Sequence, residues 1–140
     1  MSYDTDNVFA KILRGELPSE RIYEDAETLV FMDIMPRVDG HCLVIPKDPA
    51  RNFLDATPTQ LSACITVAQR IAKAAMVAFS ADGITVQQFN EAAGGQEVFH
   101  LHYHILPRMA GVPLRPPGKM EERTVIAANA EKLRSALATL

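Results

Sequence analysis

The stretch Phe99-His100-Leu101-His102-Tyr103-His104-Ile105-Leu106 places three histidines in strict alternation with apolar residues. Side chains of a β-strand point alternately to its two faces, so this pattern predicts a strand over 99–106. The three imidazoles would then share one face, and the apolar residues between them would enter the core. Only four histidines occur among the 140 residues, and this concentration makes the strand the first candidate for a functional site.

The spacing of the three rings favours binding of an elongated anion over binding of one metal ion. Successive imidazoles start about 6.6 Å apart on a strand, so three from one straight strand cannot meet at a single ion. A pair such as His100 and His102 could do so, and a metal-binding protein therefore stays an alternative. Imidazole titrates near neutrality and supplies both a nucleophilic nitrogen and hydrogen-bond donors. Phosphoryl transfer requires that combination.

The flanking sequence predicts an α+β domain with one antiparallel sheet. The links between the first extended segments are too short for helical crossovers, so those strands pair antiparallel. The expected elements are a helix over Val8–Leu13 capped by Asp6, strands over Arg21–Glu24, Thr28–Met32, His41–Ile45 and Ile84–Asn90, a polar loop over Glu91–Gln96, and a last helix from Glu121.

A long covering helix is predicted to begin at Thr57. Thr57 is the cap, Pro58 takes the first helical position, and Gln60 completes a capping box. An apolar stripe at helical spacing would lie on the sheet; it comprises Leu61, Ile65, Ala68, Ile71 or Ala72, Ala75 and Phe79. The last helix has its own apolar side, formed by Val125, Ala128, Leu133, Ala136 and Leu137.

Composition excludes several classes of partner. The net charge is −3, aromatic residues make up 6% and tryptophan is absent, so nothing indicates binding of nucleic acid. Two cysteines cannot form a disulfide framework. The N-terminus carries no signal-peptide pattern, and no uninterrupted run of about 18 apolar residues occurs. We therefore expect no membrane partner and a cytoplasmic location.

The motifs together resemble the histidine triad (HIT) family. His-x-His-x-His followed by two apolar residues is similar to the family signature. The resemblance extends from about Asp6 to Pro107, through Phe9 to Pro18, Ile22 to Asp25, Phe31 to Ile34, Gly40 to Lys47 and Asn90 to His100. The histidine triad nucleotide-binding (Hint) branch is the most similar. We accordingly expect a HIT domain core over 1–107 and a C-terminal extension over 108–140 with a helix packed on the same domain.

The resemblance implies a fold, an assembly and a reaction. The fold is a five-stranded antiparallel sheet with helices, and two protomers pair into a ten-stranded dimer. The reaction releases a nucleoside 5′-monophosphate from a leaving group on its phosphorus, as in a purine nucleoside phosphoramidase. His102 would be the nucleophile and form a nucleotidyl-histidine intermediate, and His104 would contact the phosphate or the leaving group. His100 and His41 would orient and polarise His102.

Further residues of the nucleotide site follow from the resemblance alone. Asp33 would bind the ribose hydroxyls. The base pocket would be formed by Val8, Phe9, Ile12, Phe31 and Ile34, and the phosphate would be surrounded by Asn90, Gly95, Gln96, Glu97 and Val98.

This sequence departs from the family pattern at a zinc site and at Glu97. Many bacterial members bind zinc through two cysteines, a later histidine and a triad histidine, whereas this chain has Asn7, Ala10 and Pro49 at the first three positions. We expect no metal and no cofactor. Glu97 stands where well-known members carry a hydroxyl residue, and a carboxylate repels a phosphate.

Two other functions stay open beside the phosphoramidase. A dinucleoside polyphosphate hydrolase fits His104-Ile105-Leu106-Pro107-Arg108. A nucleotide-binding adaptor with incidental hydrolysis fits the short polar loop and Glu97.

Overall fold

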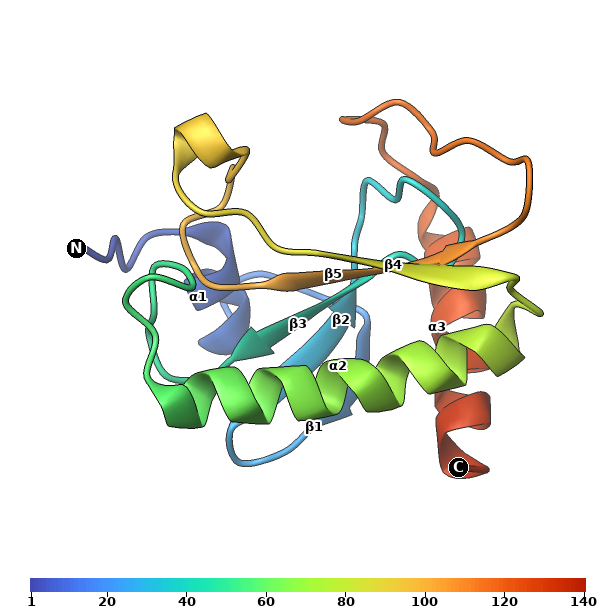
Figure 1. Ribbon diagram of the computed structural model, residues 1–140, viewed down its shortest axis with the longest axis horizontal. Coiled ribbons are helices and arrows are strands. Elements are labelled where there is room, and N and C mark those ends of the chain that lie inside the picture. The colour runs from blue at the N-terminus through green and yellow to red at the C-terminus, as the bar shows by residue number, and fades with distance from the viewer.

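The predicted α+β fold is confirmed, with all five strands in one antiparallel sheet. The computed structural model describes residues 1–140, and the strand order is β1-β2-β3-β5-β4 (Figure 1). Short turns after the first two strands enforce antiparallel neighbours, and the long excursion after the third strand carries the main helix. The strands are β1 (Arg21–Glu24), β2 (Thr28–Met32), β3 (Cys42–Pro46), β4 (Gly83–Gln87) and β5 (Tyr103–Arg108).

Helix α2 (Pro58–Ala78) covers one face of the sheet (Figure 1). Thr57 and Gln60 form the predicted capping box, which fixes the helix start. The buried side is formed by Cys64, Val67, Ala68, Ile71, Ala74 and Ala75. The prediction that Ile65 lies on this side is wrong. Ile65 is 51% exposed, because the buried stripe is centred on Cys64, Val67 and Ala68.

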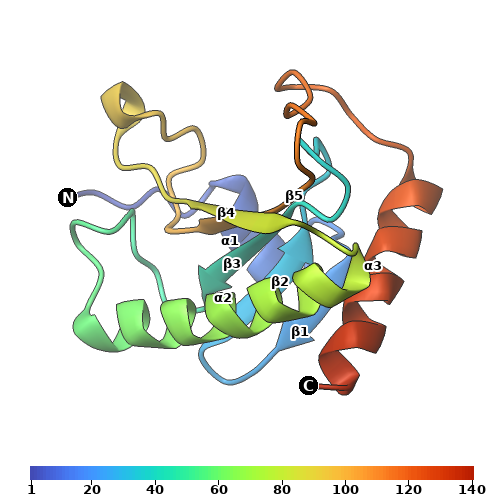
Figure 2. The same cartoon turned by 45° about the vertical axis from the view of Figure 1, so that its right-hand side comes forward.

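Helix α3 (Arg123–Ala138) crosses the end of the sheet beside α2 and belongs to the same core (Figure 2). Leu133, Ala136 and Leu137 are buried as expected. Val125 and Ala128 are exposed instead, because the buried stripe runs through Ile126 and Ala130. Arg134 ties the helix to the first strand by donating to the backbone oxygen of Arg21.

The opposite face of the sheet carries α1 (Val8–Leu13) and a second, smaller core. Asn7 caps this helix by accepting from the N–H of Ala10, so the expected cap at Asp6 is wrong. Asn7 directly precedes Val8, the first helical residue, whereas Asp6 lies one residue too early to cap the helix. The second core contains Phe9, Ile12, Leu29, Phe31, Leu43 and Ile45.

The histidine strand is shifted along the chain relative to the expectation of 99–106. β5 begins at Tyr103 and continues through Pro107 to Arg108, because Pro107 sits where its missing N–H costs the ladder little. His100 and His102 lie in the extended segment just before it. β4 ends at Gln87, three residues before the expected end, and the polar loop contains a short 3₁₀ helix, η1 (Ala92–Gly94).

By length and composition alone, α2 is apolar enough to cross a membrane. It packs one side against the sheet, as a core helix does. The absence of a membrane partner stays a prediction.

Candidate active site

The antiparallel register of β3 and β5 brings His41 to His104. Leu43 pairs with His104 in the ladder, and His41, two residues before Leu43, lies on the same face. The Nε2 atom of His41 is 2.9 Å from Nδ1 of His104. Three of the four histidines are more than nine-tenths buried, and only His104 keeps intermediate exposure. The row of imidazoles thus opens toward solvent at His104.

The proton positions on His41 and His104 follow from one backbone contact. The N–H of Arg37 donates to Nδ1 of His41 at 3.0 Å, so this nitrogen carries a lone pair. The proton of the neutral His41 ring is therefore on Nε2, and it is donated to Nδ1 of His104. Neutral His104 must then carry its own proton on Nε2. These two hydrogen bonds leave the Nε2–H of His104 as a free donor at the more exposed end of the row of imidazoles.

His102 is held by the backbone, with its reactive nitrogen free. Its Nδ1 lies 2.6 Å from the carbonyl oxygen of His100. A carbonyl only accepts, so Nδ1 carries the proton and Nε2 keeps its lone pair. Phe9 packs edge-on against the ring at 4.9 Å, and His104 lies 5.0 Å away between ring centroids. The ring is fixed in one tautomer, and its unprotonated Nε2 is available to act as a nucleophile.

His100 supports this arrangement from the core. Its Nε2 donates to the carbonyl oxygen of Pro46 at 2.8 Å, and its Nδ1 faces the hydroxyl of Tyr3. The expected relay from His100 and His41 to His102 is therefore divided: His100 contacts His102 through its backbone carbonyl, whereas the ring of His41 bonds His104.

Burial keeps all four imidazoles neutral at physiological pH. Desolvation lowers the pKa of His41 and of His100 to about 4, and that of His104 to about 3. The guanidinium of Arg37 and any charge on His102 or His41 lower the pKa of His104 further. Burial also lowers the pKa of His102. The site therefore offers a neutral nucleophile and a neutral donor, rather than the mixture of forms expected of exposed histidines.

Asp33, His41 and His104 place one ligand atom each within 4.8 Å of one another, a spacing that a metal ion could bridge. The tautomer of His41 opposes this use. Nδ1 accepts the Arg37 N–H, so the proton stays on Nε2, the nitrogen that points at the cluster. A metal ligand must be an unprotonated nitrogen. The cluster therefore fits a hydrogen-bonded relay better than a metal centre.

Gln96, expected around the phosphate, has its side-chain amide bonded to its own loop and to the segment that follows β3. Its side chain is buried and accepts from Glu91 N–H and Asn52 Nδ2, while donating to the carbonyl oxygens of Arg51 and Val98. All its hydrogen-bonding capacity is used, so Gln96 braces the loop and its side chain is not available to a ligand.

The free N–H groups of this loop lie after the glycines. Gly94 and Gly95 donate back into the η1 turn, whereas the N–H groups of Glu97 and Val98 have no partner within the chain. Gly95 has φ of 99°, and a Cβ there would lie 3.2 Å from Phe89. Glycine is required for the turn that exposes the following donors.

The loop is held in a strained shape by residues that the sequence did not single out. Glu91 adopts φ 64° and ψ 161°, a region used almost only by glycine. Its carboxylate accepts from Arg51 at 2.8 and 2.9 Å and from Asn52 at 2.6 Å. Asn90 lies beside this node and accepts from Phe53 N–H. The hydrogen bonds from these partners hold the loop in this shape and offset the strain of the Glu91 backbone.

The remaining predicted residues frame the sheet face on the α1 side. One oxygen of Asp33 accepts from Met35 N–H, and the other lies 3.5 Å from Nε2 of His41. Among the apolar residues proposed for a base, Phe9, Ile12 and Phe31 are buried, whereas Val8 and Ile34 are 45% and 49% exposed. The exposed carboxylate of Glu97 acts on His102 through its charge, raising the pKa of that ring against the dominant effect of burial.

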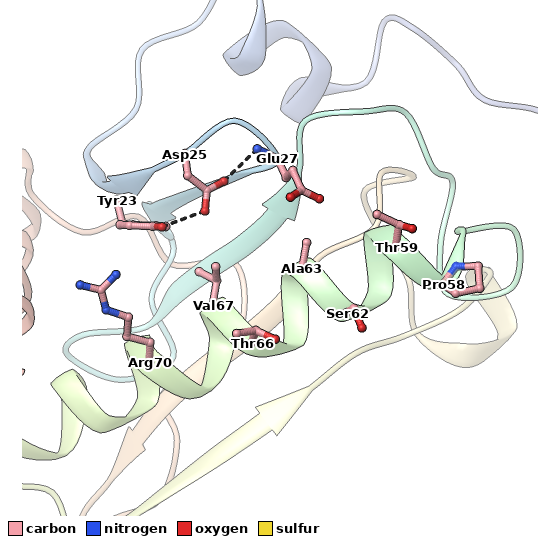
Figure 3. A pocket seen from close by; sticks show the side chains of 10 residues that line it. All are labelled: Tyr23, Asp25, Glu27, Pro58, Thr59, Ser62, Ala63, Thr66, Val67 and Arg70. Carbon is pink, nitrogen blue, oxygen red and sulfur yellow. Dashed lines mark hydrogen bonds between the residues drawn. The ribbon is translucent and has the colours of Figure 1, made fainter.

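A separate groove of about 640 Å³ lies on the α2 face, between the β1–β2 turn and the helix (Figure 3). Among its polar side chains, Asp25 accepts from Tyr23 and from the backbone of Glu27 and Thr28. Arg70 lies over the ring of Tyr23. The groove contains no histidine and is not part of the candidate active site.

Comparison with known proteins agrees with the family that the sequence resembles. Residues 14–111 match the HIT domain. An uncharacterised HIT-like protein of Mycobacterium tuberculosis is 40% identical over 74% of this chain and 72% of its own length. Adenosine 5′-monophosphoramidase HNT1 of Saccharomyces cerevisiae is 34% identical over 75% of this chain and 64% of its own. Adenylylsulfatase HINT3 of Arabidopsis thaliana is 38% identical over 74% of this chain and 52% of its own length.

Solved structures agree with the fold over nearly the whole chain. A Hit-like protein from Bartonella henselae superposes with a TM-score of 0.93 at 52% identity, over 97% of this chain and 99% of that one. A zinc-bound histidine triad protein from Mycobacterium smegmatis superposes with a TM-score of 0.86 at 36% identity, over 96% and 95%.

The residues of this chain do not fit the zinc site that the family implies. Asn7 uses its side-chain oxygen to cap α1, and Ala10 and Pro49 have no side-chain donor atom. Nδ1 of His100 already faces Tyr3.

Proposed function

Because this chain belongs to the HIT family, we propose that it hydrolyses a nucleoside 5′-monophosphate derivative through a covalent intermediate on His102. The substrate class is a purine nucleoside phosphoramidate or a similar compound. The observation that carries the proposal is the 2.6 Å bond from Nδ1 of His102 to the His100 carbonyl, which directs the lone pair of Nε2 away from the core. HNT1 and HINT3, whose names describe adenosine phosphoramidase and adenylylsulfatase activities, support this substrate class.

The first step forms a bond between Nε2 of His102 and phosphorus and breaks the bond from phosphorus to the leaving group. The histidine ring becomes positively charged as it attacks, and its Nδ1–H strengthens the bond to the His100 carbonyl. Water then attacks phosphorus, releases the nucleoside 5′-monophosphate and restores neutral His102. Burial supports the first step, because it lowers the pKa of His102 and keeps Nε2 unprotonated.

His104 supplies hydrogen bonding to the phosphoryl oxygens or to the leaving group. Its Nε2 carries a proton because Nδ1 accepts from His41. Over the two steps the departing amine takes up one proton and the attacking water gives one up, so neutral His104 acts throughout as a hydrogen-bond donor. The free N–H groups of Glu97 and Val98 add donors for the phosphate. Asp33 is proposed to bind the ribose, and Val8, Phe9, Ile12, Phe31 and Ile34 to contact the base.

Relative rates on two substrates test this substrate class. We expect faster release of AMP from adenosine phosphoramidate than from a diadenosine polyphosphate. Arg108 gives little support to the alternative function, a dinucleoside polyphosphate hydrolase, because its side chain donates to the Thr85 hydroxyl on β4. The reverse order of rates would establish the dinucleoside polyphosphate hydrolase. Tight AMP binding without turnover of either substrate would establish the adaptor.

The proposal includes a homodimer that joins two sheets into ten strands. β4 is an edge strand with one free side, and edges of this kind pair readily with another chain. Val86 on β4 is 49% exposed, and Ile65 and Val77 on α2 are 51% and 62% exposed. Association of these surfaces would cover apolar area that a monomer leaves in water. A cytoplasmic location stays a prediction.

A further inference from the structure

Tyr3 reaches the histidine row from outside residues 14–111, the part of the chain that matches the HIT domain. Its hydroxyl lies 2.5 Å from Nδ1 of His100, across a sequence separation of 97 residues. Nε2 of His100 donates to the Pro46 carbonyl, so Nδ1 of the neutral ring is an acceptor and Tyr3 is the donor. Both nitrogens of His100 are therefore engaged, one from each side.

The backbone of His100 is also the anchor of the nucleophile. Its carbonyl oxygen accepts from Nδ1–H of His102 at 2.6 Å. His100 is fully buried, and the ring of Tyr3 packs edge-on against it with centroids 5.6 Å apart. The ring and the carbonyl belong to one buried residue, so a contact that fixes the ring also restricts the carbonyl that orients His102.

We propose that Tyr3 is a positioning residue for the nucleophile: its hydroxyl holds His100, and the His100 carbonyl holds His102 in the orientation for attack. The inference rests on the proposed role of His102. Tyr3 acts through His100 and is not a catalytic residue.

The N-terminal segment is held in place for this task. In both views it lies at the end of the molecule that carries α1 and the η1 loop (Figures 1 and 2). Arg51, the residue that clamps Glu91 in that loop, also donates to the backbone oxygen of Ser2 at 3.4 Å. Asp4 accepts through its backbone from Asn7, the cap of α1. Tyr3 thus sits between two anchored points.

The substitution Tyr3→Phe removes only the hydroxyl. Its matched control is Tyr23→Phe, which removes the hydroxyl that bonds Asp25 on the opposite face of the sheet (Figure 3). We expect Y3F to lower kcat on adenosine phosphoramidate by roughly tenfold with little change in KM, since misplacement of a reacting group slows the chemical step. Y23F should keep the parent kcat.

A spectroscopic measurement separates positioning from general loosening. The parent should show the Nδ1–H proton of His102 by NMR in slow exchange with water, and Y3F should exchange it faster at an unchanged melting temperature. Turnover of Y3F within twofold of Y23F would overturn the inference, as would a lower kcat with unchanged exchange at His102. If the parent has no hydrolytic activity, the proposed function fails, and the exchange rate alone decides the role of Tyr3: faster exchange in Y3F supports it, and unchanged exchange overturns it.

Discussion

Nε2 of His41 lies 2.9 Å from Nδ1 of His104, and the other nitrogen of His41 accepts the backbone N–H of Arg37. This pair of contacts directs the donor of His104 outward, where a phosphate would bind. The position of the proton on the His104 ring, near the opening of the site, is therefore set by the Arg37 amide on the far side of His41.

The contact predicts opposite outcomes for two substitutions of His41. The amide of His41→Gln places an N–H near the former Nε2 and can still donate to His104, whereas His41→Leu cannot. We expect H41L to lower kcat about a hundredfold, the scale of a lost proton-transfer group, and H41Q to retain most of the activity. Steady-state kinetics on adenosine phosphoramidate measures both. Equal loss in the two variants would show that size, and not the donated proton, matters at this position.

The neutral histidines make the stability of the fold depend on pH. Burial lowers the pKa of His41 and His100 to about 4 and that of His104 to about 3. In an unfolded chain, by contrast, histidine has a pKa of about 6.5. Between these values the unfolded chain binds more protons. The free energy of unfolding therefore falls as pH decreases below about 6.5, by up to roughly 1.4 kcal/mol per pH unit for each histidine.

Denaturant unfolding at about pH 7.5 and about pH 5 measures this dependence. H41Q lacks one of the titrating rings and should lose less stability over the same interval than the parent. An equal free energy of unfolding at both pH values in the parent would contradict the buried neutral state of the histidines.

Glu97 should weaken the binding of nucleoside monophosphates. Its carboxylate is exposed, yet its charge reaches His102. Removing one negative charge near a phosphate dianion should tighten AMP binding by roughly two- to fivefold for an exposed group, so we expect this gain in Glu97→Gln. Calorimetric titration with AMP measures it, and salt should reduce the gain. Glu122→Gln, at the start of α3, is the control. Equal or weaker AMP binding by E97Q would place Glu97 away from the phosphate.

The assembly is tested on the edge strand. Val86→Lys puts a charge on β4, and charged edges oppose pairing between sheets. We expect the parent to be a dimer in light scattering and V86K to be a monomer. Val112→Lys, at a site with similar exposure (52%), should leave the dimer intact. A monomeric parent would contradict the proposed ten-stranded sheet.

Local signals in the sequence predicted the elements that local chemistry decides. Thr57 and Gln60 marked the start of α2 because both partners of the capping box lie within one turn. The alternation around His102 correctly predicted which side chains share a face. Ile65 was assigned to the wrong side because its spacing fits two neighbouring stripes, and only the packing of the sheet against Cys64 and Ala68 decides between them.

The contacts that set proton positions join residues far apart in sequence. Tyr3 and His100 are one example, and the loop is likewise shaped by Arg51 and Glu91, 40 residues apart. Gln96 was expected at the phosphate because the resemblance places it there, but its amide makes four hydrogen bonds, to Glu91 and Val98 nearby and to Arg51 and Asn52 after β3. A periodic pattern in the sequence cannot predict such pairings, because they form only when the 91–96 loop packs against the segment that follows β3.

The covalent intermediate on His102 is the most direct test of the central claim. Acid quench of the parent during turnover of adenosine phosphoramidate, followed by mass spectrometry of peptides, should find AMP attached to His102. The variant His102→Ala should show neither the adduct nor measurable turnover, although AMP binding persists. Turnover by H102A at the parent rate, or an adduct on another residue, would contradict the account.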